Sequence, residues 1–192
     1  MLTFRTRRAS KGQRAQSTIE FAMVTPIFFL IFFGIINGGT LLYSRNALQH
    51  AADVGAVQIA TLGNATNVDI GNAIPAMEAA GMNNVMLTTI TGVTVQKEDA
   101  SGSSSGETLT PDTSGCGGSP CEQQYTESGG VWTCTGICTW PSQNRDTSQS
   151  SGLAGDPDFA RLTIYYTFAL VGGFATYHMS ASVVFRLEPQ TL

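Results

Sequence analysis

The stretch FAMVTPIFFLIFFGIINGGTLLY, residues 21–43, decides the architecture of this chain because it runs for 23 residues without a charged side chain. A helix rises about 1.5 Å per residue, so this stretch spans roughly 34 Å, enough to cross a hydrocarbon core of about 30 Å. We therefore predict a single transmembrane helix over residues 21–43.

Charge is unevenly distributed around this stretch. Residues 1–20 carry five Lys or Arg and one acid, whereas residues 21–192 carry five Lys or Arg and thirteen acids. Because positively charged flanks of a membrane span stay inside the cell, we expect a basic cytoplasmic leader over residues 1–15 and a body outside the cytoplasm. An acidic body also argues against nucleic-acid binding, which needs positive charge on the folded part.

Two export signals are alternatives to a permanent anchor. A secretory signal peptide has an apolar core of about 7–15 residues that ends in a small-residue cleavage site. This run is longer and no A-x-A pattern closes it, although Gly38 and Gly39 are small. The pair Arg7-Arg8 resembles a twin-arginine signal, but the residues that follow it lack an apolar pair. Both observations favour an anchor.

The helix is expected to continue past the membrane, so that it covers residues 16–62. Beyond the span, small and apolar residues recur at spacings of three and four on one side, and polar residues lie on the other. The first group is Leu48, Ala51, Ala52, Gly55, Ile59 and Leu62, and the second is Asn46, Gln49, His50 and Asp53. The apolar stripe either receives another helix or packs on the chain's own globular part. A shorter helix is predicted over residues 68–80.

Residues 63–192 are predicted to form an extracytoplasmic domain with a small antiparallel β-sheet. Alternating apolar and polar side chains predict strands over residues 85–95, 160–170 and 175–187, the last two forming a hairpin around Gly172-Gly173. A second membrane helix is an alternative, since residues 162–185 carry no charge. The strict period of two favours strands. The predicted fold class is therefore α+β, with the long helix first.

A low-complexity segment, residues 99–157, interrupts these strands, because 29 of its 59 positions are Gly, Ser or Thr. It contains all four cysteines, Cys116, Cys121, Cys134 and Cys138. Disulfides persist outside the cytoplasm, and no His lies between the two cysteine pairs, so we predict disulfides rather than a zinc site. Spacing leaves three pairings open. Together with Tyr125, Trp132 and Trp140, the cysteines predict a disulfide-stapled loop.

No pattern predicts an enzyme, a bound metal or a cofactor. Residues 102–106, GSSSG, match the G-x-S-x-G nucleophile motif around Ser104, but that motif needs a strand before it and a helix after it. Asp156-Pro157-Asp158 lacks the further ligands of a calcium loop. Neither His50 nor His178 has a carboxylate partner that the sequence identifies.

Glu20 is the carboxylate at the edge of the apolar run. A carboxylate there is costly unless it stays hydrated at the headgroups or finds a partner. If the leader were cut after Ala15, a new amino group would appear at Gln16, one helical turn from Glu20. An ammonium and a carboxylate at this spacing can pair within one subunit or between neighbours.

Two segments carry a family resemblance. The sequence AQSTIEFAMVTP at residues 15–26, followed by an apolar run that ends in Gly34-Ile35-Ile36, resembles the N-terminus of TadE-like proteins, the minor pseudopilins of tight-adherence (type IVb, Flp-like) pilus systems. Residues 42–52, LYSRNALQHAA, are similar to the helix that follows the span in that family. The resemblance covers about residues 12–60, and the end of the last strand, residues 184–189, is also similar.

The resemblance implies a structural pilus assembly component without catalytic activity. A prepilin peptidase would cut between Ala15 and Gln16, and Glu20 and Phe21 would be the acidic and aromatic pair used in assembly. The mature protein would be a single-pass protein of the inner membrane, with its N-terminus cytoplasmic, that contacts other pilin or pseudopilin subunits through its N-terminal helix. The family commonly has Gly before the cut, where this chain has Ala15.

The alternative function is a membrane-tethered extracytoplasmic binding module that no prepilin peptidase processes. In that case the loop with the cysteines, Trp132 and Trp140 would be its contact surface. A secreted hydrolase that uses Ser104 is a more distant alternative.

Overall fold

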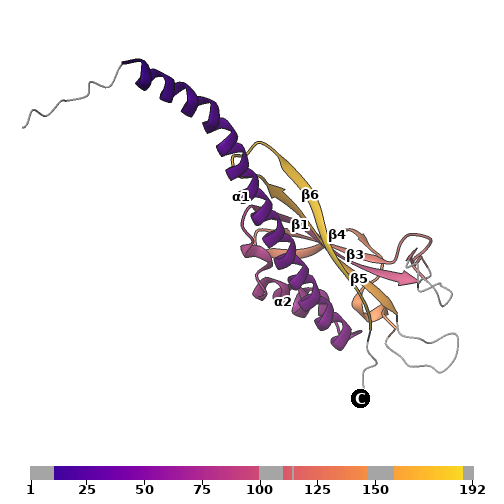
Figure 1. Cartoon of the computed structure of the whole chain (residues 1–192). Helices are drawn as coiled ribbons and strands as arrows, with labels where there is room; N and C mark the ends of the chain where they lie inside the picture. Colours follow the sequence, from indigo (N-terminus) through magenta and orange to yellow (C-terminus); the bar gives the residue numbers. More distant parts are fainter. Residues whose placement is uncertain (1–10, 100–109, 114, 147–157, 188–192) are drawn as a thin grey trace, which may run out of the picture. The chain divides into compact units, whose positions relative to one another are not determined.

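A computed structural model describes residues 11–99, 110–113, 115–146 and 158–187 (Figure 1). The chain divides into two compact units, residues 1–39 and residues 40–192. Helix α1 (Lys11–Leu62) begins in the first unit and ends in the second. The predicted fold class is confirmed, since a long apolar N-terminal helix precedes an antiparallel β-sheet domain that carries two disulfides.

The second unit combines short helical segments with an antiparallel sheet. After α1 the helical segments are the π-helical turn η1 (Asp69–Ala73), α2 (Ile74–Ala79) and the 3-10 turns η2 (Met82–Asn84) and η3 (Ser142–Asn144). The strands are β1 (Thr88–Asp99), β2 (Thr110–Pro111), β3 (Glu122–Ser128), β4 (Val131–Cys138), β5 (Phe159–Ala169) and β6 (Thr176–Arg186).

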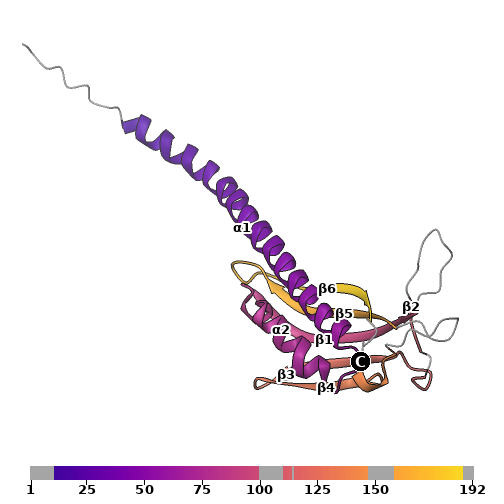
Figure 2. The same ribbon diagram turned by 90° about the horizontal axis from the view of Figure 1, so that it is seen from below.

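The strand order is β4-β3-β1-β5-β6, and the short β2 pairs with β1 outside this path. Every pairing is antiparallel. Figures 1 and 2 show that α2 and the part of α1 in this unit lie on one face of the sheet. The central strands β1 and β5 therefore bring residues from the middle and the end of the chain together beneath the helices.

The C-terminal hairpin forms as predicted, with β5 and β6 paired from Phe159↔Arg186 to Ala169↔Thr176. Its even-numbered β5 residues form the core, and all are at most 1% exposed: Ala160, Leu162, Ile164, Tyr166 and Phe168. At the tip, Gly172 and Gly173 have positive φ angles of 102° and 71°, which favour glycine. The alternative of a second membrane helix over this region is therefore wrong.

The apolar stripe of α1 beyond residue 40 packs on the chain's own sheet. Its buried members are Leu48, Ala51, Ala52, Ala56 and Ile59, and the opposite side is exposed at Asn46, His50 and Asp53. A Cβ atom at Gly55 would lie 2.6 Å from the Met77 Sδ and 2.9 Å from Leu162 Cδ2. Glycine at this position therefore allows α1 to approach α2 and β5 closely.

Two side-chain hydrogen bonds tie α1 to the rest of this unit. The Gln49 amide donates from Nε2 to the Ser182 carbonyl oxygen in β6 at 3.1 Å. The fully buried Ser44 hydroxyl donates to the carbonyl oxygens of Thr40 at 2.8 Å and Met86 at 3.3 Å. The helix is thus fixed at the edge strand and at the segment that leads into β1.

The segment 99–157 is more ordered than predicted. It contributes β3 and β4 to the main sheet, where Tyr125 of β3 lies opposite Val93 of β1. Its aromatic residues belong to the core, since Tyr125, Trp132 and Trp140 are 6%, 8% and 3% exposed. The two strands escaped prediction because Thr, Ser and Gly dominate their flanks and because threonine and glutamine stand at their outward positions, which gave the segment the composition of a linker.

A buried ion pair joins this segment to the helical layer. Arg145, which follows η3, donates through both terminal nitrogens to the Asp69 carboxylate in η1, with Nη1 and Oδ1 2.6 Å apart. The side chains are 0% and 3% exposed, respectively. The Tyr125 hydroxyl donates to Asp69 Oδ2 at 2.6 Å, and the Arg145 guanidinium lies 4.9 Å from the centre of the Trp140 ring.

The same network fixes the protonation of its tyrosine. Burial and the neighbouring Asp69 carboxylate raise the pKa of Tyr125 far above its ordinary value of 10.0, although Arg145 opposes the shift. The phenol therefore remains a hydrogen-bond donor across the physiological pH range. Three separate parts of the chain, η1, β3 and the segment after η3, depend on this cluster for their relative positions.

Substitution of Gly55 by Val tests the close packing of α1. Inserting a branched side chain into this contact should lower the free energy of unfolding by about 1–3 kcal/mol, because Met77 and Leu162 must move. Chemical denaturation of the full chain in detergent, followed by circular dichroism, measures the change. Asn46→Val, on the exposed side of the same helix, is the control; equal stability of the two variants would contradict the packing argument.

Substitution of Arg145 by Met tests the buried pair. It leaves the Asp69 carboxylate buried without its cation and should cost about 3–5 kcal/mol of unfolding free energy in the same assay. Replacement of the exposed Arg45 by Met should cost less than about 0.5 kcal/mol. The double variant Asp69→Leu/Arg145→Met should recover part of the loss, since it removes both charges; no recovery would argue against this account.

Candidate membrane-spanning and assembly segment

The first unit is a helix whose apolar surface the protein itself does not cover. Within Thr18–Leu62, a stretch of 18 residues is strongly apolar, and none of that stretch is buried. In the described part of the chain this is the one helix long and apolar enough to cross a membrane. Leu30 and Ile35, for example, are 75% and 71% exposed. A continuous apolar surface of this kind marks a membrane or protein contact, which supports single-pass anchoring.

Aromatic side chains form two rows on this helix. Phe28 and Phe32 stack with ring centres 6.1 Å apart, and Phe29 and Phe33 do the same at 6.1 Å. These spacings of four residues place each pair on one face. An open groove beside them is lined by Phe21, Val24, Thr25, Phe28 and Phe29. Lipid chains or a neighbouring helix can therefore contact an apolar surface rich in phenylalanine.

The polar side chains of the span bond to the helix itself. The Thr25 hydroxyl donates to the Phe21 carbonyl oxygen at 2.6 Å, and the Asn37 amide donates to the Phe33 carbonyl oxygen at 2.9 Å. Since lipid offers no hydrogen-bond partners, a polar group left without one would cost several kcal/mol, on the order of 2–7. These two bonds allow Thr25 and Asn37 to lie in an otherwise apolar segment.

Glu20 and Phe21 are both exposed and adjoin this apolar surface. The predicted cleavage residues Ala15 and Gln16 lie within the bounds of α1, four and five residues after its start at Lys11. A continuous helix from Gln16 to Glu20 places positions i and i+4 on one face. Cleavage between Ala15 and Gln16 remains a prediction.

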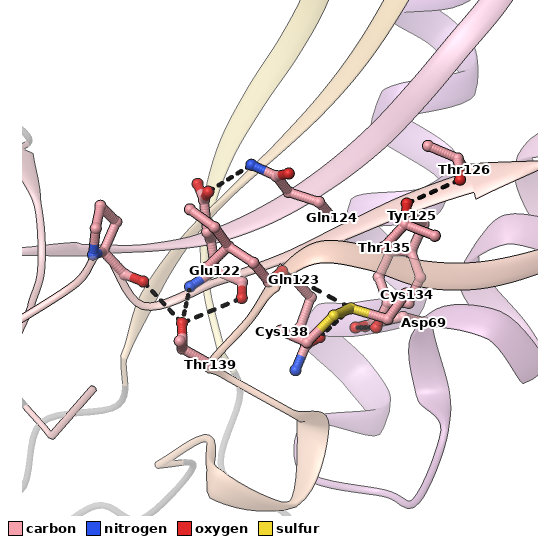
Figure 3. The surroundings of a disulfide bond; sticks show 12 residues. Asp69, Glu122, Gln123, Gln124, Tyr125, Thr126, Cys134, Thr135, Cys138 and Thr139 are labelled. Atoms are coloured by element: carbon pink, nitrogen blue, oxygen red, sulfur yellow. Dashed lines mark hydrogen bonds between the residues drawn. A yellow bond between two sulfur atoms is a disulfide. The ribbon is translucent and has the colours of Figure 1, made fainter. Parts of the chain in front are cut away.

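The four cysteines form two local disulfides. Cys116 pairs with Cys121, with their Cα atoms 5.4 Å apart, and Cys134 pairs with Cys138 at 6.2 Å. The prediction of disulfides is therefore confirmed, and of the three pairings left open the structure has the most local. Figure 3 shows the second disulfide, which joins two residues of β4.

The remaining candidates are not brought together. His50 is exposed on α1 and His178 is exposed on β6, while Ser104 lies outside the described residues. Of the acidic pair considered for calcium, Asp156 also lies outside them, and Asp158 is in an ion pair with Lys97 at 3.2 Å. The predicted helix over residues 68–80 is realised as η1 followed by α2.

Lys97 holds two acidic residues. Its ammonium lies 2.9 Å from Asp112 and 3.2 Å from Asp158. Burial lowers the pKa of Lys97, but the two carboxylates outweigh burial and the net pKa is raised. Its contribution to stability is therefore complete below its ordinary pKa and is lost as the pH rises through the higher folded-state value. These two ion pairs therefore join β1 to Asp112 and to the residue that directly precedes β5.

In the alternative function Trp132 and Trp140 would belong to a contact surface, but the structure does not expose them. Both are buried, and the Trp132 indole nitrogen donates to Glu78 Oε1 at 2.8 Å. Sequence reasoning also missed Asp69 and Arg145. A lone arginine in a Gly/Ser-rich segment gave no signal, because its partner is distant in the sequence.

Two arginines in the middle of the apolar run test the membrane anchor. Each costs about 2.5–3.5 kcal/mol of insertion free energy, so Ile31→Arg/Phe32→Arg should reduce the fraction of protein that resists alkaline carbonate extraction from membranes. The control, Asn46→Arg/His50→Arg, changes two exposed positions of the same helix beyond the run. A wild-type chain that carbonate removes from membranes would contradict the anchor.

Comparison with known proteins agrees with this geometry. The family model described as TadE-like protein matches residues 15–57. This segment contains Glu20, Phe21, the whole exposed apolar run and the first turns that pack on the sheet. No curated protein and no solved structure matches the chain. Residues 15–57 are therefore similar to TadE-like proteins, as the sequence resemblance indicated.

Proposed function

We propose that this chain is a minor pseudopilin-like assembly component of a tight-adherence pilus system, with a structural and non-catalytic role. The observation that carries the proposal is an overlap of two segments: the part that matches the TadE-like family contains the apolar run whose surface the protein leaves uncovered. The apolar run, residues 21–43, would be the stem of the protein and would lie in the inner membrane. Residues 1–15 would lie in the cytoplasm and residues 63–192 outside the cytoplasm.

Helix–helix contact in the membrane plane would be the physical basis of assembly. The aromatic rows of α1 offer a large surface for packing against a second apolar helix, with small residues such as Gly34 beside them. A Cβ atom at Gly34 would meet nothing within 4 Å. A neighbouring helix can therefore approach the backbone at this position.

Glu20 would give these contacts their register. After cleavage by a prepilin peptidase, the ammonium of Gln16 would lie within one turn of Glu20, or of Glu20 in an adjacent subunit. In a low-dielectric setting such a pair is much stronger than in water, so one aligned arrangement of two stems would be favoured over shifted ones. Cleavage would also remove all five leader cations, which hold the N-terminus at the cytoplasmic surface.

The competing function, an uncleaved tethered binding module, predicts different behaviour. Such a module needs the apolar run only as an anchor. It should therefore still function when Glu20 is substituted or when the leader is not cleaved. The burial of Trp132 and Trp140 argues against these two side chains as its contact surface.

The N-terminal mass of the membrane-purified protein tests processing. Produced with the prepilin peptidase of its system, the chain should begin at Gln16, and produced without it the chain should begin at Met1. An intact Met1 under both conditions would refute cleavage and favour the tethered module.

Substitution of Glu20 tests the assembly role. Glu20→Ala and Glu20→Gln should reduce the number of pili per cell at least about tenfold, because one charge pair in a low-dielectric site is worth more than the 1.4 kcal/mol of a tenfold change. Glu20→Asp should retain part of the function. Asp53→Asn, an exposed carboxylate on the same helix beyond the span, is the control. Normal piliation with Glu20→Ala would exclude the proposed role.

A further inference from the structure

Polar side chains cover part of the sheet face that lies away from the helices. The core residues Val93 and Val95 of β1 point toward α1 and α2, so Thr94 and Gln96 point the other way. Thr94 lies directly opposite Gln124 of β3 on one side. The same strand pairing places Glu122, Thr126 and, through β5, Thr163 and Tyr165 on this face.

A hollow of about 270 Å³ opens on this face. It is lined by Thr91, Gly92, Thr94, Glu122, Gln124, Tyr125, Thr126 and Tyr165. Register shifts occur here in two adjacent pairings, at Ile90/Gly92 in β1 and at Gln123/Tyr125 in β3. Such irregularities bend strands and redirect side chains, which explains a concave site on a sheet.

Gly92 keeps the floor of the hollow open. A Cβ atom there would lie 3.1 Å from the Tyr125 carbonyl oxygen, a tight contact, so the absence of a side chain favours the close approach of β1 and β3. Gly92 is also the partner of Tyr165 on β5. The Tyr165 side chain, 46% exposed, therefore has no side chain directly opposite it on β1.

The polar groups of the hollow are fixed by bonds among themselves. Gln124 donates from Nε2 to Glu122 Oε1 at 2.6 Å, and Gln96 donates to Glu122 Oε2 at 3.4 Å. The Thr126 and Thr135 hydroxyls lie 2.8 Å apart. Figure 3 shows the Gln124–Glu122 bond within β3 and the Thr126–Thr135 bond between β3 and β4.

A second glycine, Gly136, leaves room for the Gln124 side chain. A Cβ atom at Gly136 would lie 2.6 Å from Gln124 Oε1, so the amide occupies the space that a side chain would take. The Glu122 side chain is held in turn, since its residue is only 8% exposed. Groups fixed in this way lose little conformational entropy when a ligand binds.

The chemistry of the lining selects the kind of ligand. It combines an exposed tyrosine ring with a carboxylate, an amide and threonine hydroxyls, and no Lys, Arg or His is among the residues that line it. The Glu122 carboxylate and the lack of cations disfavour phosphates and acidic sugars. The polar walls disfavour a purely apolar ligand. A volume just below the roughly 300–1,000 Å³ of drug-sized pockets suits one small ring.

We propose that this hollow binds a neutral saccharide unit. A pyranose offers an apolar C–H face, which packs on the Tyr165 ring, and a rim of hydroxyl groups, which both donate and accept hydrogen bonds. Glu122 accepts from these hydroxyls, while Gln124 and the threonines donate and accept. The site lies in the described part of the second unit and is independent of the proposed pilus role.

Saccharide titration of the full chain tests the site. The chain is purified in a detergent without a sugar headgroup, since a glucoside or maltoside would compete, and saturation-transfer NMR follows binding of methyl glucoside, methyl galactoside, methyl mannoside and N-acetylglucosamine. We expect saturable binding of at least one of these. Glucuronate and inorganic phosphate are the anionic comparators and should bind at least tenfold more weakly.

Variants assign the binding to the hollow. Tyr165→Ala and Gln124→Ala should each weaken saccharide binding at least tenfold, whereas Tyr165→Phe, which keeps the ring, should retain it. Tyr177→Ala removes a tyrosine that is 52% exposed on β6 and does not line the hollow, so it should bind like the wild type. Unchanged melting temperatures show that each variant is folded. No binding by any saccharide, equal binding of glucuronate, or full binding by folded Tyr165→Ala would overturn the proposal.

Discussion

The contact of α1 with the sheet at Gly55 is the constraint on which the rest of the folded unit depends. At this point Met77 of α2 and Leu162 of β5 both fill space that any side chain would occupy. The helix is therefore held at close range along a stripe of small residues, while Ser44 and Gln49 fix it at two further places. Since α1 also contains the apolar run, the residues that anchor the chain and those that organise its domain belong to one element.

A second constraint is the Asp69–Arg145 pair, which attaches the cysteine-containing segment to the helical layer. A buried pair of this kind gains little net free energy compared with apolar residues, but the loss of either partner is severe. Its value here is positional: the Asp69 carboxylate accepts from both Arg145 and Tyr125, and the Arg145 guanidinium lies over the Trp140 ring, so one cluster joins three segments. The insertion thereby becomes part of the core, with β3 and β4 extending the sheet on the side opposite the C-terminal hairpin.

The elements that the sequence predicted are those with strong periodicity. The apolar run, the stripe from Leu48 to Ile59 and the alternation in β5 and β6 each repeat with a period typical of one structure. β3 and β4 were missed because threonine and glutamine at their outward positions resemble linker composition. Asp69 and Arg145 were missed because ion pairing between distant residues leaves no local pattern. Glu20 was found by its position beside hydrocarbon, and its role remains a prediction, as does cleavage after Ala15.

The order of the strands has a consequence for biosynthesis. Leu162 of β5 packs at Gly55 of α1 but follows β1, β2, β3 and β4 in the sequence, and β5 is also a neighbour of β1 in the sheet. A nascent chain would therefore carry that stripe without its cover until β5 has been synthesised. A product that terminates before β5 would lack the strand that pairs with β1 and packs at Gly55, so it could not close its core.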